Sequence, residues 1–333
     1  MGRRRAGLLV GDDSQAPVLA EFLGGASATE EFLDRWRLPG EERSQVWEER
    51  FVETMYVPLG ERAWNDALKS AALDAGDLDR IVATGTHARA VKGLTRRLGA
   101  AKEAYVDDLS ATVGNTGTAH PGLLLASVLD DASPGQTIAV IVLADGAEVL
   151  VFRTTDAVAE HRVSVPVVDQ IATGDDGLPY GKFLRWREMV TVEPPRRPPP
   201  TRTAAPPSVR SEDWKFAFVG SRDRSSGALH LPPQRVSWQG GAVDDMDPAP
   251  MADVPATVVT FTVDRMVYSP SPPVVFAVLD FDGGGRLPCE LTDVEADDVA
   301  IGDRVEMTFR RLYTAEGVHN YFWKARPIRT PEG

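Results

Sequence analysis

Two residues whose side chains could transfer a proton or stabilise a negative charge lie in predicted loops of the first half of this chain. His87 follows a short apolar run, residues 81–83, in the segment GTHA, and Asn115 lies in the segment VGNTGTAHP, residues 113–121. A histidine can transfer a proton, and imidazole or amide N–H groups can stabilise an oxyanion. Taken one at a time, a histidine after a strand is an ordinary loop residue, and GNTG is a common turn signal.

The cysteine count limits the remaining chemistry. The chain has one cysteine, Cys289, so an internal disulfide framework and a multi-cysteine metal site within one chain are excluded. Cys289 lies in RLPCELT, a predicted strand, where we expect a small buried thiol. The net charge of −13 argues against a general nucleic-acid-binding protein, which would show a basic footprint.

The sequence contains no candidate for membrane insertion. No stretch approaches the roughly 18 uninterrupted apolar residues of a membrane helix. The start, MGRRRAGLLVGDDSQ, has a basic head but too short an apolar run for a secretory signal. We therefore expect a cytoplasmic protein that does not bind membranes.

The first region, residues 1–158, alternates helical and strand-like segments. Apolar spacing and stop signals predict three helices, and β-branched runs predict three strands. The helices are expected at 61–75, 88–98 and 122–129, and the strands at 81–83, 137–143 and 148–154. This alternation is typical of a layered αβα domain.

The rest of the chain divides into a linker and a β-rich region. Residues 159–210 contain a proline- and arginine-rich stretch, 193–208, which we expect to be an extended spacer. The segment LPYGKFLRWRE, residues 178–188, is expected to pack between modules or to contact CoA phosphates. Residues 211–330 show five strand signals with glycine turns, typical of an OB-type barrel. These strands are expected at 256–268, 273–281, 286–292, 303–313 and 318–325.

The first region resembles the C-terminal half of the thiolase superfamily. The segment VGNTGTAHP, the following helix, the Ser-Pro-Gly turn and the strand TIAVIVL are similar to the hydroxymethylglutaryl-CoA synthase and ketoacyl synthase III branch. The upstream block FLDRWRLPGEERSQVWEERF, residues 32–51, resembles the same branch. The resemblance implies a thiolase-like half-domain that handles a CoA thioester.

On that pattern, His87 corresponds to the superfamily's active-site histidine and Asn115 to its asparagine partner. The resemblance implies that both are catalytic, since an imidazole N–H and an amide N–H would stabilise the charge that develops on a thioester. Gly114 and Gly117 would let the backbone bend around the substrate. His120, beside this loop, is expected to be a packing residue.

The chain departs from the superfamily at the nucleophile. The family's cysteine lies in an N-terminal half, and the segment AGLLVGD, residues 6–12, resembles a strand near the end of that half. Cys289 cannot replace this cysteine because it lies in the second module. Acyl-enzyme chemistry therefore requires a partner or a missing N-terminal half, and a truncated reading frame is a further hypothesis.

The second module, from Trp214 onward, resembles the acyl-CoA-associated OB-fold family, formerly a domain of unknown function, which carries a rubredoxin-like zinc ribbon. The resemblance rests on FAFVGS, LPPQR and the barrel segments, and it places the ribbon at about 214–247. The four zinc-ligand positions are occupied by Asp223, Ser226, Ser237 and Gly240. These residues cannot supply a tetrahedral zinc site, so we expect no zinc and no other cofactor.

Three functions remain open. The chain is an acyl-CoA-dependent acyltransferase of lipid metabolism, or a non-catalytic OB-fold scaffold of a thiolase or aldolase complex. A nucleic-acid-binding OB fold is a minor alternative, and we expect no nucleic-acid binding. We expect acyl-CoA as ligand, and either a homo-oligomer or a hetero-complex with a thiolase or synthase subunit.

Overall fold

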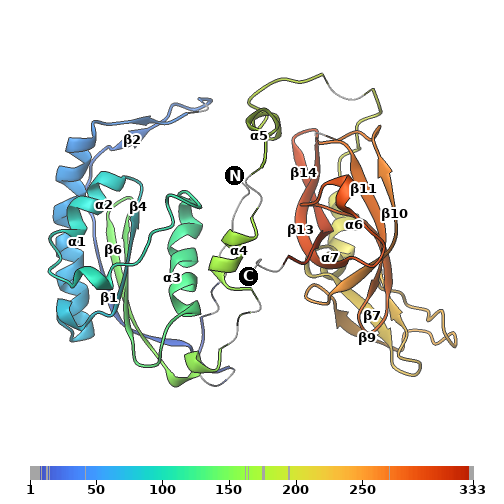
Figure 1. Cartoon of the computed structure of the whole chain (residues 1–333), viewed down its shortest axis with the longest axis horizontal. Helices are drawn as coiled ribbons and strands as arrows, with labels where there is room; N and C mark the ends of the chain where they lie inside the picture. Colours follow the sequence, from blue (N-terminus) through green and yellow to red (C-terminus); the bar gives the residue numbers. More distant parts are fainter. Residues whose placement is uncertain are drawn as a thin grey trace. The chain divides into compact units, whose positions relative to one another are not determined.

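The computed structural model divides the chain into two compact units, unit 1 (Met1–Gly174) and unit 2 (Asp175–Gly333) (Figure 1). The residues that it describes are 8, 10–12, 14, 16–41, 43–161, 163, 165–174, 177–193, 196–269 and 271–329. The segment AGLLVGD lies partly outside them, at residues 6, 7 and 9, and its described residues are not in a strand.

Unit 1 is built on a mixed four-stranded sheet in the order β1-β6-β5-β4. Strand β5 pairs in parallel with β4 and antiparallel with β6, which pairs antiparallel with β1. The strands of unit 1 are β1 (Ala20–Ala28), β2 (Arg35–Trp36), β3 (Gln45–Val46), β4 (Arg80–Gly85), β5 (Thr137–Leu143) and β6 (Ala147–Thr154). Its α-helices are α1 (Glu49–Ala71), α2 (Ala88–Thr95), α3 (His120–Asp130) and α4 (Val167–Ala172), and its short 3₁₀ helices are Ala75–Asp77, Lys102–Ala104, Gly117–Ala119 and Asp156–Ala159.

Helices cover both faces of this sheet (Figure 1). Successive strand residues point to opposite faces, so Ile81 and Ala83 of β4 belong to the cluster under α1 and α2. Val82, between them, belongs to the cluster under α3. The predicted layered αβα arrangement is confirmed, with the parallel pair β4–β5 buried between helices as such pairs usually are.

Helix α1 is longer than the sequence indicates. The predicted helix over 61–75 is wrong at both ends, because α1 begins at Glu49 and ends at Ala71. Its first turns are buried through Tyr56 and Leu59 even though Pro58 lies inside the helix. The helix ends where Ala72 adopts φ +54° and its N–H bonds to the carbonyls of the last turn. Tertiary burial, and not local periodicity, sets these bounds.

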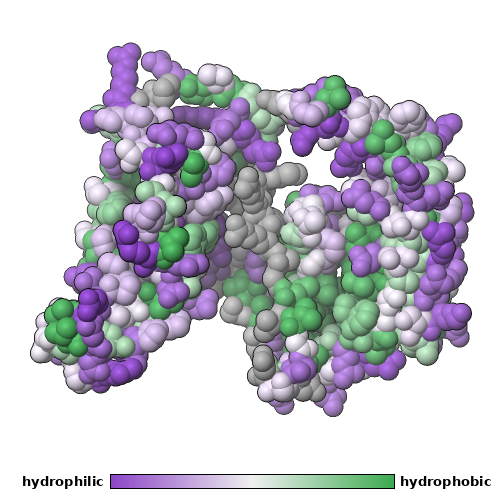
Figure 2. Space-filling model, turned by 180° about the vertical axis from the view of Figure 1, so that it is seen from behind, coloured by the Kyte–Doolittle hydropathy of each residue, from purple (hydrophilic) through white to green (hydrophobic). Residues whose placement is uncertain are grey.

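A two-stranded hairpin, β2–β3, precedes α1. The rings of Trp36 and Trp47 meet edge to face with centroids 5.5 Å apart, and Trp47 contacts Phe51 of α1 at 5.8 Å. Several large apolar side chains around this hairpin are exposed, namely Leu33, Leu38, Val46 and Trp47. Figure 2 shows one face of the molecule, on which hydrophobic and hydrophilic residues lie side by side.

Unit 2 contains a five-stranded antiparallel sheet in the order β12-β11-β10-β13-β14. A bridge between Leu291 and Ala325 joins the end of β12 to β14 and closes the sheet into a barrel. The strands are β10 (Ala256–Asp264), β11 (Val274–Phe281), β12 (Arg286–Glu290), β13 (Arg304–Ala315) and β14 (Val318–Pro327), with a 3₁₀ helix at Ala296–Asp298. All five lie close to the predicted ranges, and the OB-type barrel is confirmed.

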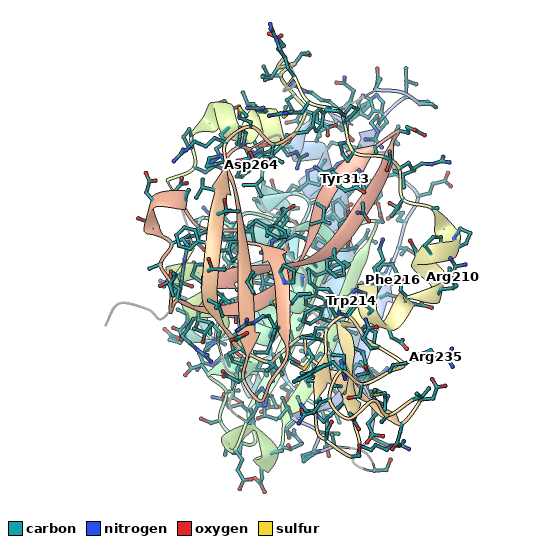
Figure 3. All side chains as sticks on the ribbon, turned by 90° about the vertical axis from the view of Figure 1, so that its right-hand side faces the viewer. Arg210, Trp214, Phe216, Arg235, Asp264 and Tyr313 are labelled. Carbon is teal, nitrogen blue, oxygen red and sulfur yellow. The ribbon has the colours of Figure 1, made fainter. Side chains whose placement is uncertain are left out.

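The predicted ribbon forms a separate three-stranded sheet in the order β8-β7-β9. Its strands are β7 (Val219–Asp223), β8 (Leu229–His230) and β9 (Met246–Pro250), and the helices before it are α5 (Tyr180–Trp186), α6 (Ala205–Arg210) and α7 (Glu212–Ala217). Figure 3 shows Trp214 and Phe216 on α7, Tyr313 on a barrel strand and Arg235 in the ribbon.

The proline-rich stretch is not extended throughout. Helix α6 begins at Ala205 and takes Pro206 and Pro207 into its first turn, where a missing backbone N–H leaves no bond unmade. The prediction of an extended spacer over 193–208 is wrong at this end. Among the described residues, no helix is long and apolar enough to cross a membrane.

Candidate functional site

The candidate site lies at the carboxyl end of the parallel pair β4–β5. His87 follows β4 and is the N-cap residue directly before α2. The N–H of Thr86 donates to the carbonyl of Leu143, the last residue of β5, over 3.0 Å. Gly85 allows this close approach, because a Cβ there would lie 2.7 Å from the same carbonyl oxygen. The ends of parallel strands are where open α/β sheets usually bind ligands.

A carboxylate contacts the imidazole of His87. Asp34, just before β2, places Oδ2 at 2.8 Å from Nε2 of His87. The two side chains are 14% and 10% exposed, so water screens this contact little. Within the described part of the chain, Nδ1 of His87 has no hydrogen-bond partner. In the neutral ring the carboxylate fixes the proton on Nε2 and leaves Nδ1 as the basic nitrogen.

Tyr56 of α1 completes the group. Its hydroxyl donates to Oδ2 of Asp34 over 3.1 Å and accepts the N–H of Asp145 over 3.2 Å. Burial, and then the charge of Asp34, raises the pKa of Tyr56, so the phenol stays a neutral donor. Asp145 lies in the turn after β5, and the Tyr56 ring is 5.9 Å from the His87 ring. The phenol therefore links the segment before β2, α1 and the β5–β6 turn around one imidazole.

Asn115 contacts the backbone of the turn that follows β4. Its Nδ2 donates to the carbonyl of Gly85 over 2.9 Å, and its Oδ1 accepts the N–H of Gly117 over 2.8 Å. Gly114 and Gly117 both adopt φ +72°, the left-handed region that favours glycine. The structure therefore brings Asn115 and His87 to the same turn, although the asparagine contacts the backbone of Gly85 and not the imidazole.

Two further residues, His120 in unit 1 and Cys289 in unit 2, are buried in their own units. His120 is 2% exposed, and its Nε2 lies 2.9 Å from the carbonyl of Asp108, as a packing residue requires. Cys289, on β12, is 5% exposed. Burial raises the pKa of its thiol to about 12, so almost no thiolate exists near neutral pH. The prediction of a small buried thiol at Cys289 is confirmed.

Asp34 and Tyr56 are the parts of this group that sequence reasoning missed. The block 32–51 contains Asp34, but the chain has 49 acidic residues, and nothing in their spacing singles out this one. The contact joins residues 53 positions apart, and it depends on how the segment before β2 folds back over α1.

The predicted ribbon positions lie on two turns of the ribbon sheet. Asp223 and Ser226 flank the turn between β7 and β8, and Ser237 and Gly240 lie between β8 and β9. No group of three or more His, Cys, Asp or Glu residues able to hold a metal ion occurs among the residues that the structure describes.

Unit 2 also has a cavity of about 500 Å³ between the ribbon and the β11–β12 hairpin, lined among others by His230, Trp238 and Phe281. Asp280 and Arg286, also in its wall, form a two-pronged ion pair at 2.6 and 2.7 Å. Nε2 of His230 is buried without a hydrogen-bond partner in the described residues. None of the residues around His87 lines this cavity.

Comparisons with known proteins identify the second module. Residues 250–310 match the family model "ChsH2, C-terminal OB-fold domain". A "DUF35 domain-containing scaffold protein" of Methanocaldococcus jannaschii is 24% identical over 119 residues, which cover 34% of this chain and 84% of that protein. The predicted resemblance to this OB-fold family is therefore confirmed.

A second relative bears on the resemblance to the hydroxymethylglutaryl-CoA synthase branch. The hydroxymethylglutaryl-CoA synthase of Pyrobaculum neutrophilum is 33% identical over 83 residues, which cover 24% of each protein. The predicted resemblance to these synthases is confirmed, although the match spans about a quarter of the synthase. Among solved structures, a chain of the "Ltp2-ChsH2(DUF35) aldolase" is 22% identical with a TM-score of 0.30, and the match covers 39% of this chain and 98% of that one.

Proposed function

We propose that the chain handles acyl-CoA thioesters in a reaction that forms or cleaves a carbon–carbon bond, with the nucleophile supplied from outside its 333 residues. The observation that carries this proposal is the contact of Asp34 with Nε2 of His87, which orients a largely buried imidazole at the end of β4. The similarity to a hydroxymethylglutaryl-CoA synthase supports the choice of substrate class.

The imidazole suits two steps of such chemistry. As a neutral base, Nδ1 of His87 removes a proton from the carbon next to the thioester, and the resulting imidazolium donates Nδ1–H to the enolate oxygen. Asp34 stabilises the imidazolium through Nε2 and keeps the ring in one orientation. Asn115 holds the Gly85 turn, and its second Nδ2 proton is a further donor for the oxyanion.

The nucleophile is the part that the chain does not supply. Cys289 is buried in the barrel, and its raised pKa, about 12, leaves no reactive thiolate. A hetero-complex with a thiolase or aldolase subunit would provide the missing cysteine.

Proton exchange tests this function without a nucleophile. Acetyl-CoA is incubated with the chain in D₂O, and loss of the methyl proton signal is followed by NMR. We expect exchange above the buffer rate, abolished by His87→Ala and retained by the neighbouring exposed variant Arg89→Gln. Binding of acetyl-CoA without exchange would refute the catalytic role, and a covalent acyl group on this chain would refute an external nucleophile.

The second candidate function is a scaffold without catalysis. It is favoured by the match to 84% of a DUF35 domain-containing scaffold protein. A scaffold would raise the activity of a thiolase-type partner equally well with and without His87. Measuring the partner's activity with the wild-type chain and with His87→Ala therefore separates the two candidates.

A further inference from the structure

The ribbon of unit 2 keeps its shape without residues that fit zinc. A structural zinc site needs four thiolate or imidazole ligands around the ion. The four positions here offer one carboxylate, two neutral hydroxyls and a glycine. Gly240 adopts φ +84°, so a ligand side chain at the fourth position would be strained. These residues therefore do not fit the metal.

Both turns of the ribbon are nevertheless closed by backbone hydrogen bonds. In the first turn, the N–H of Asp223 donates to the carbonyl of Ala228, and the N–H of Gly227 donates to the backbone carbonyl of Asp223, each over 2.9 Å. In the second, the N–H of Ser237 donates to Ala242 over 2.8 Å. The polypeptide thus has the two tight turns that would present metal ligands.

The side chain of Asp223 is buried at the first of these turns. It is 1% exposed, and Ser237 of the second turn is 4% exposed. Oδ2 of Asp223 accepts the Ser226 hydroxyl over 2.6 Å, and Oδ1 accepts the hydroxyl and the N–H of Ser225, each over 2.8 Å. The hydroxyl of Ser226 contributes most to holding the pKa of Asp223 below its ordinary value, so the carboxylate stays charged.

We propose that the buried carboxylate of Asp223, which accepts the hydroxyls of Ser225 and Ser226, stabilises this ribbon in place of a zinc ion. Two of the four ligand positions, Asp223 and Ser226, then meet through a hydrogen bond, while the hydroxyl of Ser237 donates to the carbonyl of Gln239 in its own turn over 2.9 Å. The polarity of the centre is reversed. In a zinc ribbon, anionic ligands surround a cation; here, neutral donors surround an anion. Hydrogen bonds to an ionised acceptor are the stronger kind, which suits a buried centre.

An exposed ion pair adds to the second turn. The guanidinium of Arg235 donates to both oxygens of Asp244, each over 2.6 Å, across the base of this turn. Figure 3 shows Arg235 in the ribbon part of unit 2. Because Arg235 is 83% exposed, this pair stabilises the turn less than the buried Asp223 centre does.

Metal analysis and melting of the full chain test the proposal together. We expect the purified protein to hold no stoichiometric zinc and to melt at the same temperature with and without a chelator. Asp223→Asn keeps the shape but removes the charge, and it should lower the melting temperature by about 5 °C or more. Asp245→Asn, an equal charge change at an exposed ion pair on the ribbon, should leave it unchanged.

A second variant covers the case in which Asp223→Asn does not fold. Ser226→Ala removes one hydroxyl donor and should lower the melting temperature by a smaller amount, with less than additive loss when combined with Asp223→Asn. Stoichiometric zinc in the wild-type protein would overturn the proposal. So would a Ser226→Ala variant that melts like wild type, or strictly additive effects of the two substitutions.

Discussion

Two buried carboxylates, one in each unit, are used in opposite ways. Asp34 in unit 1 faces groups that can carry or move a proton, the imidazole of His87 and the phenol of Tyr56. Asp223 in unit 2 faces serine hydroxyls and backbone N–H groups, which do not gain or lose a proton near neutral pH. We therefore expect the donors around each carboxylate to decide its role, with Asp34 orienting the imidazole and Asp223 stabilising the ribbon.

The largest effect should come from neutralising the carboxylate of unit 1. Asp34→Asn removes the negative charge and offers Nε2 of His87 an amide NH₂ donor as well as an oxygen, so the proton is no longer fixed on Nε2, and we expect proton exchange of acetyl-CoA to slow about 100-fold. Binding of acetyl-CoA and the melting temperature should change little. Glu31→Gln, an equal charge change at an exposed residue nearby, is the control. Equal loss of exchange and of folded protein would show that Asp34 is structural, like Asp223.

The second largest effect should be the loss of stability of unit 2 at low pH, which depends on the carboxylate of Asp223. The pKa of Asp223 is lowered, chiefly by the Ser226 hydroxyl, so its contribution to stability is complete above the unfolded aspartate pKa of about 3.9 and is lost as pH falls below it. Arg224 beside it is already paired with Asp245 and Asp247. Calorimetry from pH 7 to pH 3 should show the melting of unit 2 falling steeply below about pH 4. If the melting temperature of Asp223→Asn fell with pH as steeply as that of the wild-type protein, this expectation would be contradicted.

A smaller effect is expected from Tyr56→Phe. The substitution leaves the N–H of Asp145 without its acceptor and removes one donor from Asp34, at a cost of about 1–2 kcal/mol in the free energy of unfolding. Tyr105→Phe is a matched control, since the Tyr105 hydroxyl also donates one hydrogen bond, to the carbonyl of Thr95 over 2.9 Å. Denaturant titration should show similar losses for both. Proton exchange should slow in Tyr56→Phe alone.

The smallest effect should come from an exposed carboxylate. Asp282 pairs with Arg304 on the barrel, and both side chains are about half exposed. Asp282→Asn should leave the melting temperature unchanged within error, because surface ion pairs contribute little. A marked loss would mean that ion pairing on the barrel surface, and not burial, distinguishes the carboxylates of this chain.

Much of the fold follows from local sequence. The run TIAVIVL predicts β5 to the residue, because a β-branched segment between turns has few alternatives. The five barrel strands are likewise marked by their glycine turns. The bounds of α1 are not predictable in this way, since its first turns are fixed by the burial of Tyr56 and Leu59 against other elements.

The candidate site was predictable in part. His87 and Asn115 each follow a local signal, and the structure places both at the turn after β4. Their catalytic roles stay a prediction. Asp34 and Tyr56 carry no local signal, because their contacts are made only when distant segments pack together. In the ribbon, sequence position identified Asp223 and Ser226, but not that the serine would donate to the aspartate.

Because Cys289 is buried in the barrel, its thiol can be used to measure how often the barrel opens. A thiol that is 5% exposed in the folded chain reacts with an alkylating reagent only in molecules that have opened. Because the sequence holds no other cysteine, each alkylated molecule reports one opening of the strand β12. The rate of labelling, divided by that of the unfolded chain, gives the fraction of time this strand spends exposed.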